Sequence, residues 1–142
     1  MTGRTISLEF EGYWTEENKT SVPSSSGIYC VYTCEHNKIN RKVTLKKLIY
    51  IGESSNVESR ITNHNKLEYW KRQLGRGETL CYAVAKVTTG ESDRLRAEAA
   101  LIRTCRPSVN TEHKGDGPFA YNKTTVTTSG TNHSLPSSVT VA

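Results

Sequence analysis

Four residues whose side chains can move protons or bind anions follow one another in the first half of the chain. Tyr29 and Tyr50 each lie in a short run of apolar, β-branched and aromatic residues, and Arg60 and His64 come ten and fourteen positions after Tyr50. A phenol exchanges its proton near pH 10, and a histidine does so near neutral pH. An arginine binds phosphate oxygens through its forked guanidinium. These residue types suit a reaction at an anionic group in which a proton must be taken up.

Two later residues extend this set. Glu98 lies in a helical pattern, and Asn110 follows Pro107. A hard cation such as Mg²⁺ prefers carboxylate oxygen and keeps several waters, so one glutamate can suffice as its protein ligand. Each residue also has an ordinary explanation. Glu98 can pair with Arg94 or Arg103 on a helix surface, Asn110 can be a turn residue, and the tyrosines, arginine and histidine can be packing or surface residues.

Two predicted strands carry the tyrosines. The apolar runs at residues 27–34 and 46–52 indicate strands. They are joined by a long, polar and basic hairpin connection over 35–45, for which short extensions of the strands are left open. A helix starting near residue 57 would place Arg60 and His64 together at i and i+4. This arrangement brings the proton-transfer residues to one end of a strand pair.

The later part of the chain predicts the remaining framework. Residues 79–88 alternate as a third strand, and a helix begins at 90–93, with Glu98 at the margin of its apolar stripe. Residues 5–14 suggest an edge strand or an extended arm outside this core. The Thr-, Ser- and Asn-rich residues 122–142 indicate a flexible tail or a strand-prone appendage. The predicted division is an arm over 1–26, a core domain over 27–120 and a tail over 121–142.

The charge is modest but unevenly distributed. The net charge is +5, and residues 35–47 alone hold five basic residues against one glutamate, a net charge of +4. Residues 56–76 hold five basic residues against two glutamates, a net charge of +3. This pattern fits a bound polyanion and fits a solvated surface equally well. The basic residues that we expect to contact a polyanion are Lys38, Arg41, Lys42, Lys46, Lys47, Lys71 and Arg72.

Several classes of protein are disfavoured by the sequence. No apolar run approaches the length of a membrane span, and residues 1–10 hold no apolar signal-peptide core, so a cytoplasmic location without membrane contact is expected. The four cysteines show neither zinc-site spacing nor a disulfide framework, and buried free thiols are expected. His36, His113 and His133 lie outside the pattern above and are interpreted as surface residues.

The two tyrosine tripeptides carry a family resemblance. Gly27-Ile28-Tyr29 and Tyr50-Ile51-Gly52, followed in order by Arg60, His64, Glu98 and Asn110, resemble the GIY-YIG nuclease family over roughly residues 27–112. The resemblance implies an α/β fold of the α+β kind, with a small, mainly antiparallel three-stranded sheet flanked by helices. It also implies a phosphodiester hydrolase that cuts a nucleic-acid backbone with the help of Mg²⁺ or Mn²⁺.

The resemblance assigns a role to each site residue. Tyr29 would be the general base that takes a proton from the attacking water, and His64 would relay that proton or orient the phenol. Tyr50 would hydrogen-bond to the phosphate or the water. The other three roles are charge stabilisation by Arg60, metal binding by Glu98, and positioning of the metal site or the closing loop by Asn110.

The long connection between the tripeptides favours one branch of the family. Tyr29 and Tyr50 are 21 positions apart, which resembles the restriction-enzyme branch more than the excision-repair branch. The expected function is a metal-dependent endonuclease of double-stranded DNA, restriction-type or a compact phage or defence nuclease, with a homodimer on DNA left open. The alternatives are a repair-type nicking nuclease and a nucleic-acid-binding module that has lost the chemistry.

Overall fold

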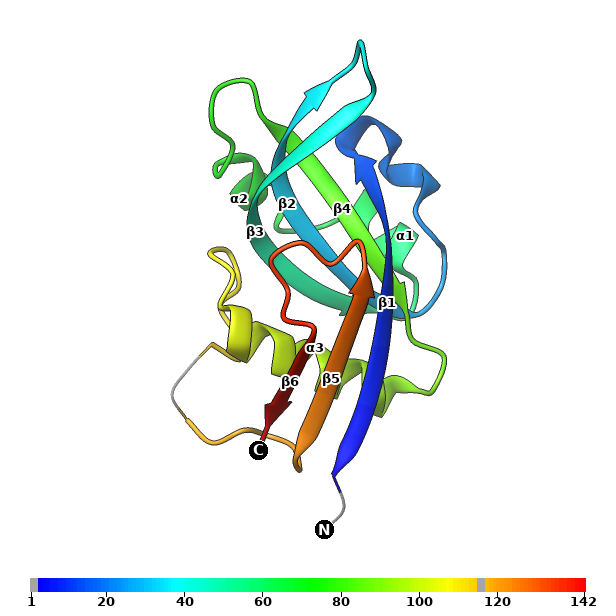
Figure 1. Ribbon diagram of the computed structural model, residues 1–142, viewed down its shortest axis with the longest axis vertical. Coiled ribbons are helices and arrows are strands. Elements are labelled where there is room, and N and C mark those ends of the chain that lie inside the picture. The colour runs from blue at the N-terminus through cyan, green and yellow to red at the C-terminus, as the bar shows by residue number, and fades with distance from the viewer. Residues whose placement is uncertain (1–2, 115–116) are drawn as a thin grey trace.

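The computed structural model describes residues 3–114 and 117–142, and in these a twisted sheet forms the centre of the fold (Figure 1). The strand order is β3-β2-β4-β1-β5-β6. The pairs are antiparallel except for β1 with β5, which is parallel. The elements are β1 (Arg4–Thr15), the 3₁₀-helix η1 (Glu16–Ser21), β2 (Gly27–Asn37), β3 (Lys42–Ser54), α1 (Val57–Thr62), α2 (Leu67–Lys71), β4 (Thr79–Lys86), α3 (Glu91–Cys105), β5 (Thr124–Gly130) and β6 (Ser138–Val141).

The mixed α/β class and the mainly antiparallel sheet are confirmed, but the sheet has six described strands where three were expected. The additional strands come from the two ends of the chain. Arg4–Thr15 is not an edge strand, because β1 lies between β4 and β5. The tail was hard to predict because threonines replace the large apolar residues of a typical strand. Thr124, Val126 and Thr128 are nevertheless buried in alternation, so β5 presents one β-branched face to the core.

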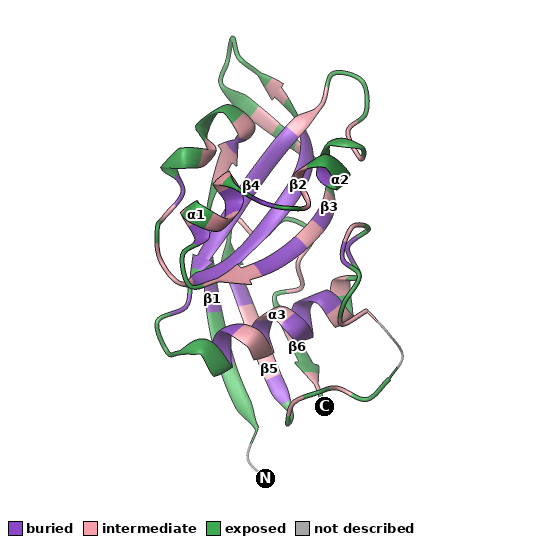
Figure 2. Ribbon diagram, turned by 180° about the vertical axis from the view of Figure 1, so that it is seen from behind, coloured by how far each residue is buried: buried purple, intermediate pink, exposed green. Residues whose placement is uncertain are grey.

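The central strands β2 and β4 are buried along most of their length (Figure 2), and an apolar cluster lies on each of their two faces. One apolar cluster joins the sheet to α3, through residues such as Ala97 and Leu101, and includes Phe10 and Val126 from the added strands. The other cluster, on the face that carries Tyr29, holds α1 and α2 through Val57, Ile61 and Trp70. As a result, Gly27–Cys34 of β2 is buried on both faces, which explains its continuous apolar run.

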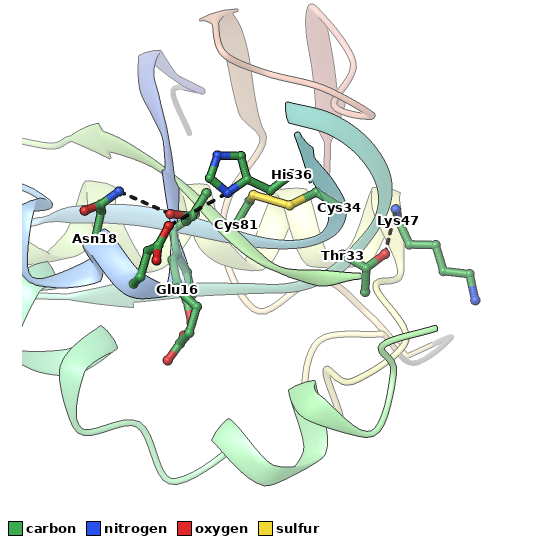
Figure 3. Close-up of a disulfide and its surroundings, with 10 residues drawn as sticks. Glu16, Asn18, Thr33, Cys34, His36, Lys47 and Cys81 are labelled. Atoms are coloured by element: carbon green, nitrogen blue, oxygen red, sulfur yellow. Dashed lines mark hydrogen bonds and ion pairs between the residues drawn. A yellow bond between two sulfur atoms is a disulfide. The ribbon is translucent and has the colours of Figure 1, made fainter. Parts of the chain in front are cut away.

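The cysteines differ from the expectation of free thiols. Cys34 of β2 and Cys81 of β4 form a disulfide with a Cα–Cα distance of 6.3 Å (Figure 3). Cys34 pairs with Thr79 and Tyr32 pairs with Cys81 in the β2–β4 ladder, so the two cysteines are diagonal neighbours across the strands. Their separation of 47 positions hid this contact in the sequence. Cys30 and Cys105 are free.

The helices of the described residues are all short or polar. None of them is long and apolar enough to cross a membrane. The longest, α3, extends over Glu91–Cys105 and carries Asp93, Arg94 and Glu98 on its buried or half-buried positions. Its role in the fold is therefore to cover the sheet and to bring polar side chains to the end of β3.

Candidate active site

The register of β2 and β3 brings the two tyrosine tripeptides together. Tyr29 pairs with Gly52, and Val31 pairs with Tyr50. The two tyrosine rings consequently lie on the same face of the sheet, with their centroids 6.2 Å apart and their planes 27° apart. A Cβ atom at Gly52 would collide with the hydroxyl and ring of Tyr29. Only glycine at this position lets the Tyr29 phenol lie across the neighbouring strand.

Arg60 and His64 reach the tyrosines from the segment after β3. Asn56 caps α1 by accepting a hydrogen bond from the Ser59 amide at 3.0 Å. The helix ends at Thr62, so the expected i and i+4 placement of Arg60 and His64 on one helix is wrong. His64 follows in a turn instead, and its carbonyl accepts from the Leu67 amide at 3.3 Å. The helix is short because Asn63 leaves the helical conformation.

His64 is held by contacts on both ring nitrogens. Its Nε2 lies 2.7 Å from the Tyr29 hydroxyl oxygen, and its Nδ1 accepts a hydrogen bond from the Lys66 amide at 2.9 Å. Since Nδ1 is an acceptor here, a neutral ring carries its proton on Nε2. Burial, with the charges of Arg60 and Lys66, lowers the pKa of His64 to about 3. His64 is therefore neutral at physiological pH and donates its Nε2 proton toward Tyr29.

The surroundings of both tyrosines raise the pKa of their phenols. Tyr29 is buried, and this burial, followed by the nearby Tyr50, raises the pKa of its phenol well above the usual value near 10. The guanidinium of Arg60 acts on this pKa in the opposite direction. Burial and then Glu98 also raise the pKa of Tyr50. Arg60 is thus the cation that can offset the cost of a negative charge on either phenol.

Glu98 faces the tyrosines from α3. Burial raises the pKa of its carboxyl group to about 7, and the carboxylates of Glu53 and Glu112 add to this effect. Its Oε1 lies 4.0 Å from Nε2 of His113. Glu53 itself is paired with Arg94, with 2.5 Å between Oε2 and Nε. The carboxylates near Glu98 therefore repel it, and Arg94 compensates mainly Glu53.

These residues surround one cleft of about 710 Å³. Of the predicted site residues, Tyr29, Tyr50, Arg60, Glu98 and Asn110 line it. His64 lies behind Tyr29 and reaches the cleft through the hydrogen bond to the phenol. The predicted site residues, which are far apart in the sequence, thus come together at one place in the fold.

Asn110 makes two hydrogen bonds to one residue of β3. Its Oδ1 accepts from the Ile51 amide at 2.9 Å, and its Nδ2 donates to the Ile51 carbonyl at 2.8 Å. The side chain is buried, and the amide of the neighbouring Val109 donates to the Ile49 carbonyl at 2.9 Å. The side-chain amide of Asn110 therefore attaches the loop after α3 to the strand that carries Tyr50.

Sequence reasoning missed several residues of the cleft. Glu53 directly follows Gly52, and its position next to the tripeptide Tyr50-Ile51-Gly52 was the available signal. Glu112 and His113 line the cleft as well, although His113 was expected to be an ordinary surface residue. Asn65 and Lys66 also line it, and Asn65 accepts a hydrogen bond from Nη2 of Arg60 at 3.2 Å. For Asn65, Lys66, Glu112 and His113, no sequence pattern distinguishes them from other polar loop residues.

The basic residues expected to bind a polyanion lie outside the lining of the cleft. Five of them belong to the β2–β3 hairpin, whose tip is far from α3 in Figure 1. Three of the seven basic residues have acidic neighbours. The nitrogen–oxygen distances are 3.8 Å for Lys38 with Glu17 and for Lys46 with Glu35 in the hairpin, and 4.0 Å for Lys71 with Glu68 on α2. Lys42 and Lys47 lie within the β2–β3 ladder, where their backbone partners are Asn37 and Thr33.

The family comparison agrees with this geometry. The model of the GIY-YIG catalytic domain matches residues 27–113, which is more than half of the chain. The chain therefore belongs to the GIY-YIG catalytic domain family and is by class an endonuclease, a hydrolase of phosphodiester bonds.

Two curated relatives illustrate the similarity. The chain is 29% identical over 101 residues to the protein named UvrABC system protein C of Rickettsia canadensis (strain McKiel), an alignment that covers 71% of this chain and 14% of that protein. The protein of the same name from Rickettsia felis is 31% identical over 119 residues, or 83% of this chain and 17% of that protein. The chain thus spans less than a fifth of their length. No solved structure matches it significantly.

These relatives do not support the restriction-enzyme branch that the long hairpin connection favoured. The family is shown by the matched domain, whereas the names of these relatives point to the UvrC type of GIY-YIG domain. The length of a hairpin connection is a weak marker of branch, because loops tolerate insertion without change at the site they flank.

Proposed function

We propose that the chain is a metal-dependent DNA endonuclease whose cleft beside Tyr29 and Glu98 cuts one strand of DNA at a time. The observation that carries this proposal is the hydrogen bond of 2.7 Å between Tyr29 and His64. It lies at the wall of a cleft that also holds Arg60 and Glu98. A proton acceptor, a fixed cation and a carboxylate are the groups that hydrolysis of a phosphodiester needs.

Tyr29 is the proposed general base. In its anionic form the phenol takes a proton from the attacking water, and the Nε2–H of His64 stabilises that form by donating to it. The Lys66 amide occupies Nδ1 of His64, which favours an orienting role for this histidine over a relay role. Arg60 provides positive charge for the phosphoryl oxygens as negative charge develops on them.

The side chain of Glu98 fits a divalent cation. Its carboxylate borders a polar cleft, and burial together with the carboxylates of Glu53 and Glu112 raises its pKa to about 7. A hard cation would relieve this repulsion, and Mg²⁺ or Mn²⁺ accepts one carboxylate while keeping water in its other positions. The residues described hold no group of three or more His, Cys, Asp or Glu placed to bind a metal, so Glu98 would be the main ligand. When bound, the cation would supply charge neutralisation and activation of water.

A restriction-type nuclease is the second candidate. The observation in its favour is the long basic hairpin, whose tip lies far from α3 (Figure 1) and could contact a duplex beyond the cutting site. Cutting both strands in one binding event needs two active clefts, so this candidate also includes a homodimer on DNA. A repair-type nuclease requires no second cleft, and this interpretation agrees with the name of the relatives. A cytoplasmic location stays a prediction.

The test is digestion of a supercoiled plasmid with the purified chain and Mg²⁺. We expect a nicked circle to accumulate before linear DNA. Direct conversion to linear fragments with fixed ends would favour the restriction-type candidate. A plasmid that stays supercoiled with Mg²⁺ and with Mn²⁺, although the chain binds DNA, would favour the inactive binding module.

A further inference from the structure

Two large hydrophobic side chains are exposed among the described residues, Ile39 and Tyr69. Ile39 is 98% exposed at the tip of the β2–β3 hairpin, and Tyr69 is 50% exposed on α2. An aromatic ring left half in water on a basic surface is accessible to a ligand that can stack on it. Tyr69 is therefore a candidate contact for such a ligand.

The neighbour of Tyr69 fixes α2 against the catalytic residues. Trp70 is fully buried, and its ring centroid lies 4.2 Å from that of His64 and 5.4 Å from that of Tyr50. The segment between His64 and α2 is further tied by the hydrogen bond from the Lys66 amide to His64. The backbone that carries Tyr69 is thus held in one position relative to the cleft.

Two cations, on long side chains, lie over the exposed ring. Nζ of Lys66 lies 5.1 Å from the centroid of Tyr69, and Cζ of Arg72 lies 5.3 Å from it. Lys66 and its neighbour Asn65 also line the cleft. Positive charge therefore continues from the wall of the cleft to the aromatic ring. An aromatic face beside cations that can hold phosphates is the arrangement that proteins use to bind an unpaired nucleotide.

We propose that Tyr69 stacks on an unpaired base next to the scissile phosphate, with Lys66 and Arg72 moving off the ring to bind the phosphates on either side of that base. The proposal rests on the nuclease function proposed above and adds a substrate class to it. The preferred substrate is DNA that has an unpaired or unstacked nucleotide beside the cut, rather than a continuous duplex. A fully paired duplex hides the faces of its bases and cannot use this ring.

A protein partner fits this surface less well. The cations beside the ring match a polyanion in charge, and the neighbouring cleft is the place where a DNA strand must lie to be cut. An apolar protein interface would need a broader patch. Among the described residues the other exposed hydrophobic side chain, Ile39, belongs to the hairpin tip and not to α2.

The experiment compares binding to two labelled probes of the same sequence in buffer with EDTA, which prevents cutting. One probe is a continuous duplex, and the other carries a short unpaired segment in one strand. The variants are Tyr69→Leu, which keeps apolar bulk without an aromatic face, and Tyr69→Phe, which keeps the face. Ile39→Ala is the matched control, because it also removes an exposed hydrophobic side chain. Melting temperatures verify that each variant is folded.

We expect the wild-type chain to bind the probe with the unpaired segment more tightly than the duplex. Tyr69→Leu should weaken binding of that probe by about 5- to 150-fold, the range for loss of one base–aromatic stack, with little change for the duplex. Tyr69→Phe and Ile39→Ala should keep the preference. Equal effects of Tyr69→Leu on both probes, or no effect, would overturn the proposal and leave the nuclease function standing. Failure of the wild-type chain to bind either probe would overturn both.

Discussion

The Tyr29 hydroxyl oxygen accepts a hydrogen bond of 2.7 Å from Nε2–H of His64, because Nδ1 of His64 already accepts from the Lys66 amide. The direction of this hydrogen bond decides what the histidine can do. A neutral ring that donates to the phenol stabilises a negative charge on Tyr29. To receive a proton on Nδ1, the ring would have to give up the Lys66 amide.

Tyr29→Phe should remove the proposed general base while keeping the packing of β2. We expect the cleavage rate to fall about 10²- to 10⁴-fold. Because burial raises the pKa of Tyr29, the wild-type rate should increase with pH from neutral to alkaline conditions, and the residual rate of the variant should lose this increase. Initial rates on a plasmid over a pH series measure both effects. A variant as fast as wild type would show that Tyr29 has only a structural role.

His64→Gln should alter the pH dependence of stability. The pKa of His64 is lowered to about 3 in the folded chain, so between about pH 6.5 and 3 the unfolded state binds a proton that the folded state does not. His64 therefore lowers the free energy of unfolding as pH falls through this window. The contribution is at most about 1.4 kcal/mol per pH unit. Urea denaturation of both proteins over this window should give a smaller slope for the variant, and identical slopes would contradict the assignment.

Asn110→Ala should destabilise the chain more than its size suggests. The change leaves the amide and carbonyl of Ile51 without the side chain that bonds to both. We expect a loss of about 2–4 kcal/mol in the free energy of unfolding. Asn18→Ala is the control, since the Asn18 side chain is exposed and donates one hydrogen bond of 3.3 Å to Thr15. Equal, small losses in the two variants would remove Asn110 from its anchoring role.

Neutralising Lys38, Arg41 and Lys42 together tests whether the hairpin binds DNA. Affinity should fall and its salt dependence should flatten, with a slope change of about one for each phosphate that the variant no longer binds. The melting temperature should hardly change, because exposed charges contribute little to folding. A variant with Lys86, Arg103 and Lys123 neutralised has the same change in charge away from the hairpin. If the two variants bind DNA with equally reduced affinity, net charge alone explains the effect.

The sequence predicted well the elements that surround the cleft, because they are built from local patterns. The apolar runs around Tyr29 and Tyr50 are strands, and Glu98 lies on a helix. The end of α1 was misjudged because apolar spacing does not reveal where Asn63 leaves the helix. Glu53 and Glu112 were missed because their effect on Glu98 arises from proximity in space.

The ends of the chain were harder to predict, because their partners are distant in sequence. Strand β5 pairs with β1 across more than a hundred residues, from Arg4 with Thr124 to Phe10 with Gly130. The Cys34–Cys81 disulfide depends in the same way on the β2–β4 register. A single sequence shows the composition of such segments but not their pairing.

The most direct test of the catalytic cleft compares Glu98→Ala with Glu91→Ala on a supercoiled plasmid in the presence of Mg²⁺. Both glutamates belong to α3, but Glu98 borders the cleft and Glu91 is exposed at the start of the helix. We predict that Glu98→Ala binds DNA with nearly wild-type affinity and leaves the plasmid uncut, whereas Glu91→Ala nicks it at the wild-type rate. Nicking by Glu98→Ala at the wild-type rate would contradict the assignment of this cleft as the metal-dependent site of cleavage.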